Sequence, residues 1–129
     1  MADQSAVRRI ALGLPQVEEA AGEFAFRVGG KLIAWAWLRR PAPGEPRVAQ
    51  PDVLALRVAN LREKEALLAA DPEKFFTEPH DDGYPTVLVR LAAVDEQDLT
   101  ELLTDAWRGR APKQLVAESG LQPTGEAAG

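Results

Sequence analysis

Two periods of hydrophobic residues alternate along the chain, and each change of period marks a new element. Apolar residues three and four positions apart are typical of helices, which we predict at residues 2–13, 61–70, 95–109 and 112–116. Apolar residues at every second position are typical of strands, which we predict at residues 24–28, 31–38, 52–58 and 86–91, with 75–77 as a short edge strand or aromatic plug. The acidic stretch 18–23 and the proline-rich stretch 41–51 show neither period, so we predict exposed connections there.

This order of elements predicts an α+β fold. Strands that follow one another in a run and are flanked by helices indicate an antiparallel sheet with helices packed on one face, which is a two-layer sandwich. The other face of the sheet would then be open. We expect a single domain over residues 1–118, followed by a tail over residues 119–129 that has almost nothing to bury and should be disordered.

The pair Gly29-Gly30 lies between two alternating runs and predicts a two-residue hairpin turn. Such a turn sets which residues oppose one another, and directly opposed residues share a face of the sheet. The predicted opposed pairs are Val28 with Lys31, Arg27 with Leu32, Phe26 with Ile33 and Phe24 with Trp35. One face would carry Phe24, Phe26, Ile33, Trp35 and Trp37, and the other Ala25, Arg27, Leu32, Ala34, Ala36 and Leu38. We expect the aromatic face to be the core face, and Trp107 to complete a core stripe on the helix before Gly109.

Composition and charge restrict the class of protein. The chain of 129 residues has no cysteine, no apolar run long enough to cross a membrane and no apolar signal core, so we expect a cytoplasmic protein. The net charge of −5 is unevenly placed, because residues 24–60 hold six cations and only two carboxylates. A basic segment on an acidic body can form an anion-binding face, although scattered arginines on a soluble acidic surface are an equal alternative.

Several segments together resemble those of one known family. They are ALGLPQVEE (residues 11–19), FRVGGKL (26–32), LLAADPEKFFTEPH (67–80), GYPTVLVRL (83–91), DAWR (105–108) and APK (111–113). Over roughly residues 7–116 the chain resembles the MmcQ/YjbR family. The resemblance implies a frataxin-like (CyaY-like) α+β fold and a DNA-binding role suggested for a double-wing arrangement of hairpins. It supplies no catalytic residues, and the loop after Arg40 looks longer than is usual in the family.

Candidate chemistry centres on His80, the only histidine, which lies in the turn-rich stretch 78–85. The two serines, Ser5 and Ser119, lie near the ends of the chain, so a nucleophilic triad is excluded and we expect no enzyme activity and no cofactor. A metal site of His80 with Asp81 and Asp82 is the weaker reading, because neighbouring residues rarely converge on one ion. We interpret this stretch as a turn that delivers the following strand. The acidic group Glu18, Glu19 and Glu23 could also handle metal, but a solvated acidic turn is the better interpretation, so we assign no metal site.

The open face therefore supplies the candidate site. Its floor would be Ala25, Ala34, Ala36 and Ala55. Arginines would rise around that floor from three strands, with further cations near the hairpin tip and the proline-rich loop. The candidate anion-binding residues are Arg27, Lys31, Arg39, Arg40, Arg47, Arg57 and Arg90.

We expect these residues to bind single- or double-stranded nucleic acid first and an acidic peptide or protein second. In the competing reading, Leu32, Leu38 and Leu88 bury this face in a homodimer. Both a monomer and a homodimer are compatible with the sequence. An acidic metal-handling role is the third alternative.

Overall fold

The computed structural model describes residues 2–120, which form four α-helices, six strands and two short 3₁₀ turns. The helices are α1 (Gln4–Leu12), α2 (Leu61–Ala70), α3 (Glu96–Arg110) and α4 (Lys113–Ser119). The strands are β1 (Val17–Glu19), β2 (Ala25–Val28), β3 (Lys31–Arg39), β4 (Val48–Arg57), β5 (Phe75–Phe76) and β6 (Thr86–Arg90). The 3₁₀ turns are η1 (Pro79–Asp81) and η2 (Leu91–Ala93). The predicted disorder of the tail concerns chiefly residues 121–129, which lie outside the described residues.

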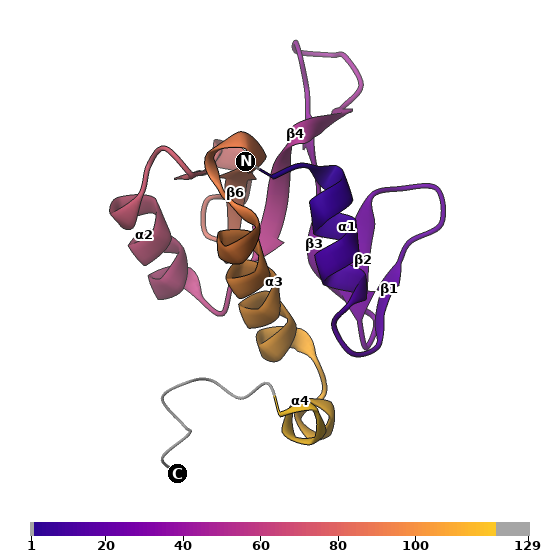
Figure 1. Ribbon diagram of the computed structural model, residues 1–129. Coiled ribbons are helices and arrows are strands. Elements are labelled where there is room, and N and C mark those ends of the chain that lie inside the picture. The colour runs from indigo at the N-terminus through magenta and orange to yellow at the C-terminus, as the bar shows by residue number, and fades with distance from the viewer. Residues whose placement is uncertain (1, 121–129) are drawn as a thin grey trace.

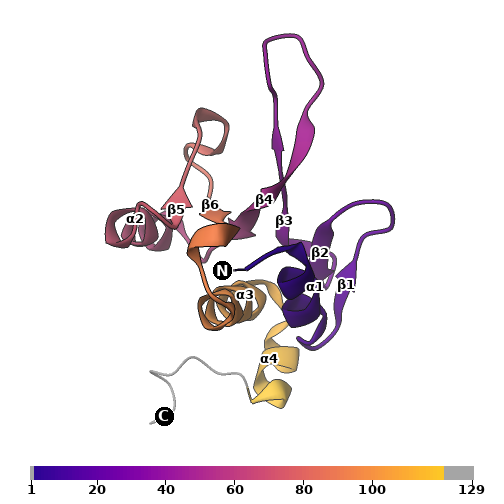
Figure 2. The same ribbon diagram turned by 45° about the horizontal axis from the view of Figure 1, so that its top comes forward.

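The six strands form one sheet in the order β1-β2-β3-β4-β6-β5, and every neighbouring pair is antiparallel. Helices α1 and α3 cover one face of this sheet, whereas the long β3–β4 hairpin extends away from them (Figures 1 and 2). The predicted α+β class, an antiparallel sheet with helices on one face, is therefore confirmed.

The core lies between the sheet and the helices. Two opposed pairs of β4 and β6, Leu54 with Val89 and Leu56 with Val87, point into it and are buried. Trp107 of α3 is also fully buried, as predicted, and its indole Nε1 donates a hydrogen bond to the Pro15 carbonyl oxygen at 2.8 Å. That bond satisfies the one polar group of the ring.

Local signals placed several elements correctly. Helix α2 covers residues 61–70 as predicted, with Asn60 as its N-cap and with Pro72 two residues after its end. The capping box of α3 is also confirmed, because the Asp95 carboxylate accepts from the Asp98 backbone N–H while the Asp98 carboxylate accepts from that of Asp95. Helix α3 nevertheless runs one residue past Gly109, to Arg110.

The prediction of exposed loops for two stretches of the chain is partly wrong. Val17–Glu19 forms the edge strand β1 along β2, and Val48–Pro51 begins β4, so that the proline-rich segment is the end of a long hairpin arm. Hydrogen bonding to a neighbouring strand stabilises both stretches, and no period in the sequence reports it. Pro51 is tolerated because the β3–β4 pairing is irregular between Leu54 and Gln50.

The predicted hairpin register is correct at the turn and wrong beyond it. Gly29 and Gly30 have φ values of 58° and 79°, and Val28 opposes Lys31 while Arg27 opposes Leu32. Phe26 then opposes Ala34 instead of Ile33, because Ile33 is an extra residue in β3. Ile33 and Ala34 are both fully buried in the core, as expected of a β-bulge.

The bulge exchanges the faces of the residues that follow it in β3. Trp35 and Trp37, predicted for the core, lie on the open face and are partly exposed. Ala34 and Ala36, predicted for the open face, oppose Leu56 and Leu54 on the core face. The prediction assumed an unbroken alternation, and a single inserted residue reverses it.

Candidate anion-binding face

The centre of the open face is a row of four opposed residues. Trp35 of β3 opposes Ala55 of β4, and Ala55 opposes Leu88 of β6. On its other side Trp35 opposes Ala25 of β2. Small neighbours on both sides therefore leave the indole above the floor of the face, where the prediction had placed Ala34 and Ala36 and no tryptophan.

A hollow of about 570 Å³ opens beside this row, and we name it the Trp35 hollow. Residues from the β2–β3 hairpin, from β4, from the segment before β6 and from the end of α3 converge on it. Its lining side chains with charge or aromatic character are Arg27, Lys31, Trp35, Arg57, His80, Asp81, Tyr84 and Arg110. Four permanent cations thus surround one space that holds a single carboxylate.

The four cations of the Trp35 hollow make no ion pair within residues 2–120. The pKa of Arg110 is lowered, first by burial and then by the charge of nearby Arg57. The Arg110 Nε is buried and has no hydrogen-bond partner in the described part of the chain. Two neighbouring guanidinium groups that form no ion pair within residues 2–120 are an arrangement that a bound anion would stabilise.

The one carboxyl group in this hollow is itself in an unfavourable position for its charge. Burial raises the pKa of Asp81, and the Glu78 carboxylate raises it further, while His80, Lys64 and Arg47 act in the opposite direction. Asp81 is therefore the one carboxyl group among the four cations that line this hollow.

A second hollow of about 540 Å³ lies between the β3–β4 arm and the segment after β5, and we name it the arm hollow. Its cations are Arg39, Arg40 and Arg47, and the guanidinium of Arg47 donates to the Leu38 carbonyl at 3.0 Å. Trp37 forms one wall, where its Nε1 donates to the Glu78 carboxylate at 3.0 Å. The Trp37 ring also packs edge-to-face on Phe76, with ring centroids 5.5 Å apart.

His80 belongs to both hollows and so marks where they meet. The segment that carries it is held from below by Lys64 of α2, a buried residue whose Nζ donates to the carbonyl oxygens of Asp81 at 2.7 Å and Tyr84 at 3.0 Å. This confirms a turn over residues 78–85 that leads into β6. The turn also positions His80 and Tyr84 above the open face, which the sequence did not indicate.

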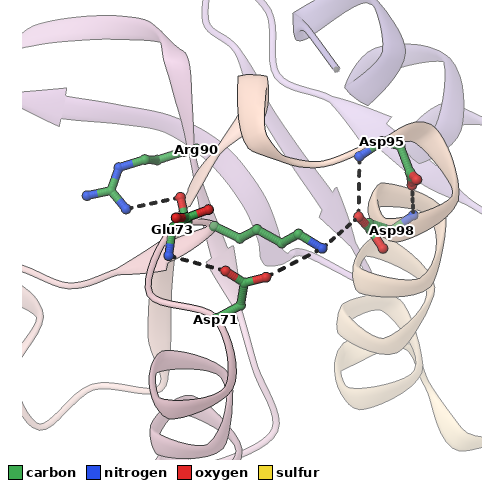
Figure 3. A network of polar contacts seen from close by, with 6 residues as sticks. Asp71, Glu73, Arg90, Asp95 and Asp98 are labelled. Carbon is green, nitrogen blue, oxygen red and sulfur yellow. Dashed lines mark hydrogen bonds and ion pairs between the residues drawn. The ribbon is translucent and has the colours of Figure 1, made fainter.

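Arg90 is the one predicted site residue that lines neither hollow. Its guanidinium donates to the carbonyl oxygens of Pro72 and Glu73 and lies 4.2 Å from the centroid of the Phe76 ring. Figure 3 shows it beside the network that links Asp71, Asp98 and Asp95 near the start of α3. These contacts use the donors of Arg90 locally.

The structure therefore brings six of the seven predicted residues to the two hollows and adds four that sequence reasoning missed: Trp35, Trp37, Tyr84 and Arg110. A bulge hid the position of Trp35. Arg110 looked like an ordinary cation in the last turn of a helix, where it suits the helix dipole. Tyr84 is 59% exposed, the highest value among the large hydrophobic residues of the described range, and only the fold shows that exposure.

The acidic residues that were weighed as metal ligands are arranged differently. Glu19 accepts two hydrogen bonds from the Arg8 Nε, at 2.8 and 3.1 Å, and one from its terminal nitrogen at 2.8 Å, while Glu18 lies across the sheet from Arg27. No group of three His, Asp or Glu side chains within residues 2–120 could hold a metal ion. In the same residues, no helix combines the length and the apolar character needed to span a membrane.

The fold and the residues on the open face of the sheet together define a class of protein. It is an α+β protein whose antiparallel sheet carries cations and aromatic rings on the face opposite to the helices. The chain belongs to the YjbR family, whose model matches residues 12–109. It is 46% identical over 125 residues to Uncharacterized protein Mb2600 of Mycobacterium bovis, and equally to Uncharacterized protein Rv2570 of Mycobacterium tuberculosis. Each alignment covers 90% of this chain and 94% of the relative. No solved structure matches the chain.

Proposed function

We propose that this protein is a non-catalytic nucleic-acid-binding domain that holds the phosphate backbone on its open sheet face. The observation that carries the proposal is the convergence of Arg27, Lys31, Arg57 and Arg110 on one hollow without an ion pair in the described residues. The DNA-binding role suggested for the MmcQ/YjbR family supports the same conclusion.

Electrostatics favour a polyanion over a single small anion. The arm hollow adds Arg39, Arg40 and Arg47 next to the first group, so that positive charge extends from the hairpin tip to the β3–β4 arm. Neutralising successive phosphates releases condensed counterions, and that release supplies most of the affinity of such a surface. The net charge of −5 on the whole chain would repel nucleic acid elsewhere and restrict contact to this face.

A binding role also fits the residues that are close to His80. Neither Ser5 in α1 nor Ser119 in α4 lines a hollow, so no serine is placed to be activated by the imidazole. We therefore propose that His80 contacts ligand without taking part in a reaction.

The test is a titration of the full chain with a labelled 12-nucleotide DNA, single-stranded and duplex, at about 50 and about 200 mM salt. Affinity should fall steeply with salt, and each cation that is removed should reduce the slope of log K against log[salt] by about 0.7 for single strands or about 0.9 for duplex. We expect the double variant Arg27→Ala/Arg57→Ala to lose roughly two such steps.

Arg62→Ala is the matched control, because Arg62 is exposed on α2 and lines neither hollow. It removes one arginine charge outside the hollows and should leave the slope unchanged, whereas each arginine removed from the Trp35 hollow should lower it by one step. Absence of binding to either DNA at low salt would refute the proposal. Light scattering should give the mass of one chain, whereas a stable dimer that protects Leu32 would favour the homodimer reading of this face.

A further inference from the structure

Trp35 differs from the other two tryptophans because its indole N–H has no hydrogen-bond partner among residues 2–120. The Nε1 of Trp37 donates to Glu78 and that of Trp107 donates to Pro15, but the Nε1 of Trp35 donates to no acceptor in residues 2–120. Within the same residues, Trp35 also has no stacked ring and no guanidinium over it, unlike Trp37 with Phe76 and Phe24 with Phe26 and Arg8. Trp35 therefore presents its ring and its N–H group to the solvent, where a ligand can contact them.

The surroundings of Trp35 leave room for a second flat group. Its opposed neighbours on both sides are alanines, Ala25 and Ala55, which do not cover the ring. The hollow beside it, about 570 Å³, falls within the range of roughly 300–1,000 Å³ that is usual for ligand pockets. Tyr84 and His80 add two further rings to its wall.

We infer that the ligand of this face is single-stranded nucleic acid, with one unpaired base stacked on Trp35 and the adjoining phosphates bound by the cations around it. This inference rests on the proposed function and narrows it to one class of nucleic acid. Base–aromatic stacking is tolerant of sequence because every base has a π-face. A duplex offers no such face, since its bases are already stacked on one another and paired.

The position of the arm hollow extends the same arrangement. It meets the Trp35 hollow at His80 and contributes Arg39, Arg40 and Arg47. A flexible single strand that leaves the Trp35 hollow can follow this basic path, which combines stacking rings with an electrostatic groove. A duplex, with a persistence length of about 50 nm, adapts to such a path much less readily than a flexible single strand does.

The experiment measures quenching of tryptophan fluorescence and competition binding, with an unlabelled mixed-sequence 12-mer and its duplex as probes. The wild-type chain should bind the single strand at least several-fold more tightly than the duplex, with quenching of its emission. Trp35→Ala should weaken single-strand binding by about 5- to 150-fold, the range for losing one base–aromatic stack. Trp35→Phe keeps a ring, so it should retain most of the affinity while losing most of the quenching.

Trp35→Phe also provides the answer if Trp35→Ala fails to fold. Unchanged quenching in that variant, or a duplex that competes as well as the single strand, would overturn the inference. In either case a salt slope that still depends on Arg27 and Arg57 would leave the proposed function standing. Absence of binding to both DNAs would overturn both.

Discussion

Lys64 makes a specific prediction, because one buried ammonium group holds the turn that forms the wall of the site. The residue is 5% exposed, and its Nζ donates to the carbonyl oxygens of Asp81 and Tyr84, 17 and 20 residues further along the chain. Replacement by methionine keeps the aliphatic stem within the core and removes only the charged donors. Lys64→Met therefore removes the two hydrogen bonds together with the buried charge.

The expected cost follows from the geometry. A hydrogen bond to a charged group contributes about 1.5–3 kcal/mol, and an acceptor left unsatisfied in a buried position costs a similar amount. The two effects do not add fully, because the turn is partly exposed and can rotate its carbonyls toward water, and because the variant no longer buries a charge. We expect a net loss of about 2 kcal/mol in the free energy of unfolding, or about 8 °C in Tm at roughly 4 °C per kcal/mol for a domain of this size.

Urea denaturation and thermal melts measure this loss, and Arg62→Met on the exposed side of the same helix is the control, expected within about 0.5 kcal/mol of wild type. Lys64→Met should also weaken DNA binding, because the turn that presents His80 and Tyr84 loses its support. A variant as stable as the wild type would refute the reasoning and would mean that desolvation of the ammonium cancels both bonds.

Two further predictions concern the backbone and the pH dependence of stability. Gly30→Ala should lower the free energy of unfolding by about 1–2 kcal/mol, because φ is 79° at this position although no atom lies within 4 Å of an added Cβ. Gly109→Ala, within α3, should raise the free energy of unfolding by about 0.5–1 kcal/mol. Equal effects of the two substitutions in urea denaturation would contradict this reasoning. Burial is the main cause that raises the pKa of Asp81 in the fold, so the folded chain binds the Asp81 proton more tightly than the unfolded chain does. The stability of the fold therefore falls as the pH rises from the ordinary pKa of Asp through the raised pKa. Asp81→Asn should therefore be more stable than wild type at pH 7, with the difference vanishing below pH about 4; a difference that is constant with pH in thermal melts would show that the charge is not the cause.

Sequence reasoning succeeded where the cause of the structure is local. Asn60 caps α2 through a side-chain bond three residues away, and Pro72 limits the backbone of the residue before it, so both ends of the helix could be predicted. The Gly29-Gly30 turn needs positive φ at both positions, and only glycine supplies this cheaply. The cationic character of the β2–β4 region was likewise predictable from composition alone.

The composition of the candidate site depended on contacts between distant segments. Edge strand β1 exists because β2 supplies its hydrogen bonds, and Arg110 reaches the open face because α3 ends beside Arg57. Neither relation leaves a period or a motif in the sequence.

The sequence by itself determined the helices, the hairpin turn, the α+β class and the excess of cations between residues 24 and 60. Only the tertiary structure decided that Ile33 forms a bulge and is buried in the core beside Ala34. This bulge places Trp35 on the opposite face of the sheet, near the arginines. The physical reason is that alternation along a strand has a period of two, so a single bulge, stabilised by packing against helices far away in the chain, reverses the face of the residues that follow it.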